Sequence, residues 1–564
     1  ESLEIYKEWK SREGFLPILL RLSDIGESAE DIKNYLQDAY FNWEIPPEYV
    51  LLIGDPTILP AYTYPDPGGC GGTYVVDDYF ATLEGEDMIA DIFVGRFSVA
   101  TPPQLETVIE KSLKVECDPD LSDPDYFKRA VFMAGDAYEP DTIYYSPKLY
   151  AKDLLFQIGF TQVDTFFVTP DHMPSSAEVL EAIDEGCQFI NFRANSGGLP
   201  AYPFNDVVPD GLSNGFKLPI YVAISCLLGN FDVAEPSYDE MWLRAGSPTE
   251  PKGAVAVIAA SGCTIAEPGD YWFHTIRRNA VDKGIFRAFT LDSLWHLGPA
   301  FERGRLNVYG ECPMPLWAAN YHYTETNLQG DPTLPVWTDT PSPLETEYPR
   351  EITIENPTLT VSVRKNGMPL KGAIVCLRED TSLYELGETD ETGTVEFHLQ
   401  FHHMGLMDIT ITGQNSLPDT GRIIVTSEIS PFIYPTHYGL LDTIRGNGDS
   451  VPNPGEAIRF KVNLTNAGGS TAHNTRVTLS TNTNYITIID SVDSIGEIPV
   501  DDTITSGGLL FEVSPIGPDR YPFNLTLGIK SSNSPPFYYE VPVSYTHLRA
   551  HETRHDLVCR LLLE

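Results

Sequence analysis

The sequence predicts an α/β domain with a mostly parallel sheet, followed by two all-β sandwiches. The chain has 564 residues, more than a single hydrophobic core serves. Short apolar runs alternate with helical patterns over residues 1–338, and period-two segments replace them after that point. The hydrophobic fraction of 42% is sufficient for several buried cores. We therefore expect domains at 1–338, 343–428 and 429–543.

Six runs in the first domain have the near-continuous apolar pattern of strands that are covered on both faces. They are Tyr49–Asp55, Ala90–Val99, Lys128–Asp136, Gln188–Ala194, Pro219–Ser225 and Gly253–Ser261. Helical segments lie between them, and two begin with the spacing of a capping box, Thr101 with Gln104 and Ser237 with Glu240. Alternation of strands and helices over this length predicts a parallel sheet with right-handed crossovers.

The second half of the chain has the pattern of short antiparallel strands. Its period-two segments are separated by turn signals such as Asn366–Gly367 and Thr392–Gly393. This pattern predicts the sandwiches at 343–428 and 429–543. The Pro-rich segment Thr340–Pro349 is expected to be an exposed linker that few contacts cross.

The last residues differ in composition from everything before them. Ser544–Glu564 contains three His and three Arg directly after a region rich in Thr, Asn and Pro. This peptide resembles an in-frame translation of a sequencing adapter. We expect 544–564 to be an adapter-derived artefact that packs on nothing.

Charge and cysteine usage exclude several classes of function. Asp and Glu number 80 against 37 Lys and Arg, which gives a net charge of -43. Nucleic acid and anionic membranes are disfavoured partners because both require a basic patch. The sequence has no apolar run long enough to span a membrane. The eight cysteines are spread singly, without metal-ligand spacing, so we expect neither zinc nor a disulfide framework; Cys226 and Cys263 could still meet as a pair.

An ordered set of motifs in the first domain resembles the gingipain family of secreted bacterial cysteine peptidases. The motifs are YVLLIGDPTILPAY, DIFVGRFSVATPPQLETVIEKSL, FINFRANSGG, PIYVAISCLLGNF, MWLRAGSPTEPKGAVAVIAASG and NLQGDPTLPVW. The resemblance implies a caspase-like fold for residues 1–338 and a polypeptide substrate. It also implies a secreted or cell-surface location, with the signal peptide and anchor absent from this fragment. The first sandwich is similar to a carboxypeptidase-regulatory-like module and the second to an adhesion-type immunoglobulin-like repeat, so cell-surface partners of the sandwiches are expected.

The same resemblance assigns two site residues. Cys226 falls at the nucleophile position, and Asn195 falls where the family has its catalytic His. No histidine lies between His172 and His274. An Asn cannot carry the proton that an amide leaving group needs, and losing a general acid–base costs about 10²–10⁴ in rate. We therefore expect little or no peptidase activity, and nothing beside Cys226 that stabilises its thiolate.

Each candidate also has a structural interpretation. Cys226 and Asn195 each follow a predicted strand, at the sheet edge where ligands gather in open α/β sheets. Cys226 is otherwise a buried core thiol, and Asn195 a turn former. His172 is a substitute base or a solvated loop residue. His274 and His296 are expected to be packing residues.

Acidic residues form the remaining candidates. Asp77 and Asp78 resemble an acidic stretch of the family near the site, and a solvated or calcium-binding turn is expected there. The loop Gly446–Glu456 is expected to be a plain turn, with calcium as its alternative. Asp232 and Glu235 follow the cysteine and either select basic side chains or pair with a helix N-terminus. No cofactor is required, and structural calcium stays open.

Three functions are therefore compatible with the sequence. The first is a gingipain-like cysteine endopeptidase whose base comes from elsewhere. The second is a catalytically degenerate member that binds peptides. The third is a surface adhesin whose α/β domain has no ligand.

Overall fold

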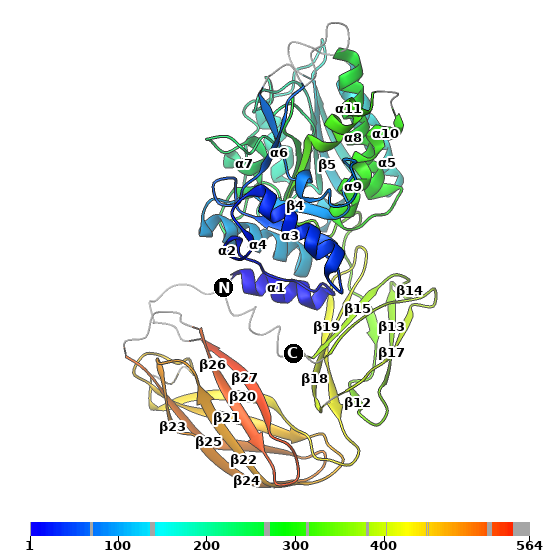
Figure 1. The fold of residues 1–564 in the computed structure, drawn as a ribbon. Helices are drawn as coiled ribbons and strands as arrows, with labels where there is room; N and C mark the ends of the chain where they lie inside the picture. Colours follow the sequence, from blue (N-terminus) through cyan, green and yellow to red (C-terminus); the bar gives the residue numbers. More distant parts are fainter. Residues whose placement is uncertain are drawn as a thin grey trace.

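A computed structural model of the chain describes residues 2–67, 72–135, 142–263, 271–311, 315–379, 383–401, 403–446, 448, 450–515 and 522–544. It contains an α/β domain followed by two β-sandwiches, as the sequence predicts (Figure 1). No described helix has both the length and the apolar character that a membrane crossing requires.

The α/β domain is built on one eight-stranded sheet. Its strands lie in the order β1 (Tyr49–Ile53), β4 (Phe93–Phe97), β10 (Thr326–Gln329), β9 (Ala256–Ala260), β8 (Ile220–Ala223), β7 (Phe189–Arg193), β5 (Arg129–Ala134) and β6 (Gln162–Phe167). Neighbouring strands run parallel except at β10, which is antiparallel to β9. A separate hairpin is formed by β2 (Tyr62–Pro65) and β3 (Thr73–Val76). The mostly parallel sheet and the six predicted strands are confirmed.

Helices cover both faces of this sheet. They are α1 (Ser2–Glu13), α2 (Leu22–Ile25), α3 (Ala29–Asn42), α4 (Pro102–Cys117), α5 (Thr142–Gln157), α6 (Ser176–Asp184), α7 (Tyr238–Arg244), α8 (Tyr271–Thr290), α9 (Leu297–Arg305), α10 (Asn307–Glu311) and α11 (Leu316–Thr324). Alternate residues of the central strands point to opposite faces. Phe189 and Val222 pack with α5, α8 and α9, while Ile190 and Ala223 pack with α6 and α7. Burial on both faces explains the continuous apolar runs.

The two predicted capping boxes have different outcomes. Ser237 precedes α7, and its N–H donates to Glu240 Oε2 at 2.9 Å, as expected. Thr101 precedes α4, but its side chain makes no capping hydrogen bond, so that prediction is wrong. Gln104 instead accepts from the N–H of Ala100 at 2.8 Å. Pro102 and Pro103 begin α4 without N–H groups, which leaves fewer donors for a side chain to cap.

The first sandwich contains the strands of residues 345–426. One sheet has β11 (Glu345–Glu347), β13 (Thr358–Lys365), β14 (Met368–Pro369) and β17 (Thr394–His398); the other has β12 (Glu351–Thr353), β19 (Asp419–Thr426), β18 (Gly405–Thr412), β15 (Ile374–Glu379) and β16 (Leu383–Glu388). The turn from β13 to β14 is formed by Asn366 and Gly367, whose φ angles are 53° and 75°. Positive φ at both positions is what an Asn-Gly hairpin turn requires.

The second sandwich contains the strands of residues 433–544. One sheet has β20 (Ile433–Arg445), β21 (Ala457–Asn466), β25 (Thr503–Val513) and β23 (Ile486–Asp490); the other has β24 (Val492–Ile498), β22 (Ala472–Thr481), β26 (Pro522–Lys530) and β27 (Phe537–Ser544). Apolar residues from both sheets share one buried core. β27 ends at Ser544, and residues 545–564, where the adapter-like peptide was predicted, lie outside the described residues.

The segment predicted as a free linker is tied to its neighbours. Asn415 Oδ1 accepts from the backbone N–H groups of Thr338 and Asp339 at 2.8 and 3.1 Å. β11 pairs with β13 inside the segment. The first sandwich also lies against α1 (Figure 1), where Arg378 forms an ion pair with Glu8. The expectation that few contacts cross this segment is therefore wrong.

Candidate functional site

Cys226 lies in a tight turn after β8, and both neighbouring strands fix that turn. The N–H of Ala194, after β7, donates to Ser225 Oγ at 3.1 Å. On the other side, the N–H of Leu227 donates to Gly262 O, after β9, at 3.1 Å. Leu227 has a φ of 61°, in the left-handed region that leucine rarely adopts. Such a conformation persists only where the surroundings enforce it, and it is often found at functional sites.

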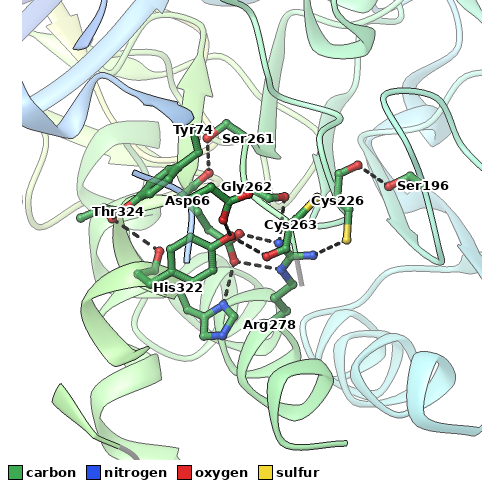
Figure 2. Close-up of polar contacts among 12 residues, drawn as sticks. Asp66, Tyr74, Ser196, Cys226, Ser261, Gly262, Cys263, Arg278, His322 and Thr324 are labelled. Atoms are coloured by element: carbon green, nitrogen blue, oxygen red, sulfur yellow. Dashed lines mark hydrogen bonds and ion pairs between the residues drawn. The ribbon is translucent and has the colours of Figure 1, made fainter. Parts of the chain in front are cut away.

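The Asn195 segment lies directly beside this turn. Ser196 Oγ donates to the backbone oxygen of Cys226 at 2.5 Å, as Figure 2 shows. Asn195 Oδ1 accepts from the hydroxyl of Tyr144, which belongs to α5, at 3.3 Å. The structure therefore brings together the two strand ends that the sequence singled out.

The thiol of Cys226 has a cationic partner. Arg278 Nη1 of α8 lies 2.8 Å from Cys226 Sγ (Figure 2). A guanidinium beside a thiol favours the thiolate. The expectation that nothing near Cys226 stabilises its thiolate is therefore wrong. Helix α8 supplies this charge from 52 positions further along the chain.

Arg278 is buried and held by Glu325, the residue after α11. Its Nε donates to Glu325 Oε1 at 2.8 Å, Nη2 donates to Oε2, and Nη2 also donates to Gly262 O at 3.0 Å. Burial alone lowers the pKa of Arg278, but the negative charges of Cys226 and Glu325 outweigh burial and raise this pKa well above its ordinary value. Arg278 is therefore a permanent cation in this site.

His322 completes the row of side chains behind the cysteine. Its Nδ1 lies 2.7 Å from Glu325 Oε1, and both residues are fully buried. Burial raises the pKa of Glu325, but Arg278 and His322 lower it to about 2. The carboxylate is thus ionised at neutral pH. Cys226, Arg278, Glu325 and His322 form a continuous polar row from the sheet edge into the interior.

A second buried cation lies near the thiol. Arg193, in β7, donates from Nε to Asn279 Oδ1 at 3.2 Å, and its guanidinium lies over the ring of Tyr144. Its pKa is lowered by burial and by Arg278, against an opposing contribution from Cys226. Two buried arginines, Arg278 and Arg193, therefore interact electrostatically with Cys226, although the chain as a whole is acidic.

A cleft of about 430 Å³ opens beside the Cys226 turn. It is lined by Gly197, Gly198, Leu199, Val208, Leu227, Asn230, Val233, Glu235, Pro236, Ser237 and Met241. Leu227 directly follows the cysteine, and Gly197 follows Ser196. Most of the lining side chains are apolar, and Glu235 is exposed. The cleft is suited to an uncharged, apolar group beside the Cys226 turn.

The comparison with known protein families decides what this fold and site belong to. Residues 1–337 match the model of peptidase family C25. The chain belongs to peptidase family C25. Gingipain R1 of Porphyromonas gingivalis is 24% identical over 450 residues, covering 76% of this chain and 42% of the relative. Lys-gingipain of the same species (strain ATCC 33277) is 22% identical over 474 residues, covering 77% of this chain and 25% of the relative.

Two solved structures share the fold of this domain. The crystal structure of the Arg specific cysteine proteinase gingipain R (RGPB) matches with a TM-score of 0.64 and 19% identity, over 75% of this chain and 94% of that chain. The complex of Porphyromonas gingivalis RgpB pro- and mature domains matches with a TM-score of 0.63 and 20% identity, over 75% and 96%. The caspase-like fold of the C25 domain is confirmed. The chain spans less than half the length of the gingipain R1 that it matches.

The histidines predicted around the C25 site have distinct environments. His172 is exposed in the turn that it forms with Thr169. His274 belongs to α8, but its side chain lies outside the described part of the chain. His296 precedes α9 and packs against Trp295, with ring centroids 4.0 Å apart; burial lowers the pKa of His296 to about 4. His296 is thus a packing residue.

The acidic pair near the C25 site holds arginines. Asp77 accepts from Arg96 Nε and Nη2 at 2.8 and 2.7 Å. Asp78 Oδ1 lies 2.7 Å from Arg305 Nη1, and burial raises the pKa of Asp78 to about 6. These contacts favour a structural role over calcium binding at this pair. Over the described residues, no three His, Cys, Asp or Glu side chains gather as a metal site.

The other predicted loop residues lie at the surface. Asp232 and Glu235 are both exposed, and Glu235 borders the cleft. In the loop Gly446–Glu456, for which a plain turn is expected with calcium as the alternative, the N–H of Gly448 donates to Asp442 Oδ2 at 2.8 Å, while positions 447 and 449 lie outside the described residues.

The cysteine pairing differs from the sequence expectation. Cys226 forms no disulfide, so it does not pair with Cys263. Cys263 is disulfide-bonded, whereas Cys117, Cys187, Cys226 and Cys376 form no disulfide. Cysteines that are spread singly carry no local signal for such a bond.

Proposed function

We propose that the C25 domain is a catalytically degenerate peptidase that binds polypeptide through its Cys226 edge and hydrolyses amide bonds poorly. One observation carries the proposal: Arg278 Nη1 lies 2.8 Å from Cys226 Sγ. An active cysteine peptidase needs a partner that accepts the thiol proton and later gives it to the leaving amine. The partner seen here is a cation whose raised pKa keeps its own proton.

The position assigned to the family's histidine supports the same conclusion. The resemblance places Asn195 there, and its side chain accepts a hydrogen bond from Tyr144. An amide can orient a ligand, but it does not exchange protons near neutral pH. Cys226 can therefore act as a nucleophile, but neither Arg278 nor Asn195 can donate the proton that a departing amine needs.

The cleft supports retained binding of polypeptide. Its apolar lining begins at Leu227, one residue after the nucleophile position. Ligand sites in proteins combine such an apolar lining with a few placed polar groups. Gly198, which also lines the cleft, would offer its backbone N–H to a bound carbonyl, whereas the N–H of Gly197 donates to Leu199 O at 3.2 Å. We propose a peptide ligand that places an apolar side chain in the cleft.

The disulfide at Cys263 bears on location. Disulfides persist in oxidising compartments and are rare in the cytosol. Together with membership of the C25 family, this supports a secreted or cell-surface protein, as proposed from the sequence. The sandwiches would then carry contacts with surface partners.

Binding and turnover have to be measured separately to test the proposal. Wild type and Cys226→Ala are both expected to bind peptides with apolar residues, measured by fluorescence anisotropy of labelled peptides. Neither is expected to cleave fluorogenic peptide amides. Rapid cleavage by the wild type that disappears in Cys226→Ala would show an active peptidase with another base. Absence of binding in both proteins would favour a pure adhesin.

A further inference from the structure

We propose that the side chains of Lys148 and Asn191 become joined by an amide bond, an isopeptide cross-link inside the C25 domain, with Asp282 as the proton carrier. The three residues belong to α5, β7 and α8, and Asn191 lies 43 positions from Lys148 and 91 positions from Asp282 in the sequence. The inference goes beyond the proposed function and depends neither on peptide binding nor on Cys226. It assigns a covalent modification to three side chains of the domain interior.

The three side chains contact one another in a closed triangle. Lys148 Nζ donates to Asn191 Oδ1 and to Asp282 Oδ2. Asn191 Nδ2 donates to Asp282 Oδ1 at 2.9 Å. All three residues are fully buried. An amine, a carboxamide and a carboxylate are therefore held together away from bulk water, and well-oriented groups of this kind react as if at effective concentrations of about 10⁵–10⁸ M.

Apolar side chains surround Asn191. It lies beside Phe132 of β5 and Val222 of β8 in the sheet. Phe189, two residues earlier on the same face of β7, packs edge-on against Phe286 of α8 with ring centroids 5.7 Å apart. All four neighbours are buried in one core. Such surroundings disfavour the charged form of an amine that lies among them.

Burial prepares Lys148 as a nucleophile. It lowers the pKa of Lys148 from 10.5 to about 8; the carboxylate of Asp282 opposes this change, and Arg193 adds to it. At neutral pH the uncharged fraction of Lys148 is therefore much larger than that of a solvated lysine. The uncharged amine carries the electron pair that an attack on a carbonyl carbon requires.

The carboxylate of Asp282 contacts both the nucleophile and the leaving group. Lys148 Nζ attacks Cγ of Asn191 with its electron pair, and a nitrogen–carbon bond forms. Asp282 accepts the proton that the amine loses and returns it to Nδ2 of Asn191, which its other oxygen contacts. The bond from Cγ to Nδ2 then breaks, and ammonia leaves with the electron pair. One amide replaces another, so the step needs no oxidant, reductant or further reactant.

A second buried lysine provides an internal control. Lys111 of α4 is fully buried, and burial lowers its pKa from 10.5 to about 7. Its Nζ donates to the backbone oxygens of Leu243 at 2.8 Å and Ala254 at 3.4 Å. Lys111 is therefore expected to remain a free amine. Its comparison with Lys148 separates the effect of burial from that of a paired carboxamide and carboxylate.

The test is peptide mapping of the full wild-type chain, purified in its folded form and then denatured, reduced and digested with trypsin. Trypsin does not cut after an acylated lysine, so residues 130–152 and 153–193 are expected as one linked pair, with the summed mass of the two peptides less one ammonia. Trypsin should still cut after Lys111. Separate peptides that end at Lys148 and that contain unmodified or deamidated Asn191 would overturn the inference.

Variants distinguish the covalent bond from a purely structural ion pair. Lys148→Arg keeps the cation and Asn191→Leu keeps the size of the side chain, and neither should give the linked pair. In a time course after cell-free synthesis, Asp282→Asn should slow formation of the linked pair by about 10²-fold or more, the cost of losing a general acid–base, and Asp282→Glu should restore part of the rate. Formation at the wild-type rate in Asp282→Asn would overturn the role of Asp282. The wild-type map decides whether the bond exists without any variant, so poor folding of a variant does not affect that result.

Discussion

Replacing Glu325 by Gln removes the charge that holds Arg278, and the structure gives the size of the effect. The pKa of Glu325 falls from its ordinary 4.5 to about 2, because Arg278 and His322 outweigh the cost of burial. One pKa unit corresponds to about 1.4 kcal/mol, so the ionised carboxylate contributes about 3 kcal/mol to folding at pH 7. Removing one partner of a buried ion pair typically costs about 3–5 kcal/mol of stability, and the value obtained from the pKa of Glu325 agrees with this range.

Urea unfolding monitored by tryptophan fluorescence measures this loss of stability in the C25 domain. All seven tryptophans lie between Trp9 and Trp337, so their signal reports the C25 domain and not the sandwiches. Glu325→Gln is expected to lower the free energy of unfolding by about 3 kcal/mol at pH 7. Glu235→Gln, at an exposed carboxylate, should leave it unchanged.

The stabilisation by ionised Glu325 depends on pH in a predictable direction. The folded-state pKa of Glu325 is the lower one, so its stabilisation is complete above pH 4.5 and declines as the pH falls toward 2. The difference between wild type and Glu325→Gln should therefore narrow below pH 4.5. A loss under about 1 kcal/mol at pH 7, or a difference that stays constant with pH, would refute the role assigned to this ion pair.

Three further predictions use other contacts of the structure. Burial, with the nearby Glu240, raises the pKa of Asp239 from 3.8 to about 8, so the cost of ionising Asp239 in the folded state grows as the pH rises through this range. Asp239→Asn should therefore increase the free energy of unfolding of the C25 domain at pH 7 by about 4 kcal/mol in urea, and no gain would contradict this. Segment 338–349 should resist limited proteolysis read by mass spectrometry, and Asn415→Ala should expose it; early cutting in the wild type would show that its contacts do not protect it. Chelation of calcium should not change the melting temperature measured by tryptophan fluorescence. Asp77→Asn should lower this temperature because Arg96 loses one of its two contacts with a carboxylate. A lower melting temperature on chelation would support calcium binding at Asp77 and Asp78.

The fold was largely predictable because its signals are local. Each central strand is an apolar run that both helix layers cover, so the run itself shows in the sequence. β10 was missed because its residues, Thr326–Gln329, are mostly polar although buried. Asn327 is satisfied by the backbone oxygen of Val75 at 3.0 Å, a partner 252 positions away. No local pattern reveals such a contact.

Only the part of the site that lies at the ends of strands was predictable from the sequence. Cys226 and the Asn195 segment follow adjacent strands, and parallel strands bring their ends to one edge. Arg278 and Glu325 lie in helical regions, where a charge usually faces solvent. Their meeting depends on how α8 and the end of α11 pack, 47 positions apart in the sequence. The same holds for Asn415, whose side chain binds a segment 76 and 77 positions earlier.

Cleavage of peptide amides by the Asn195 variants tests the central claim most directly. Wild type, Asn195→His, Asn195→Gln and Cys226→Ala are incubated with the same fluorogenic peptides that carry an apolar residue before the scissile bond. We expect no turnover above the Cys226→Ala background for wild type and Asn195→Gln, and turnover that depends on Cys226 for Asn195→His, because an imidazole there can protonate the leaving amine. Turnover by the wild type equal to or above that of Asn195→His would contradict the account.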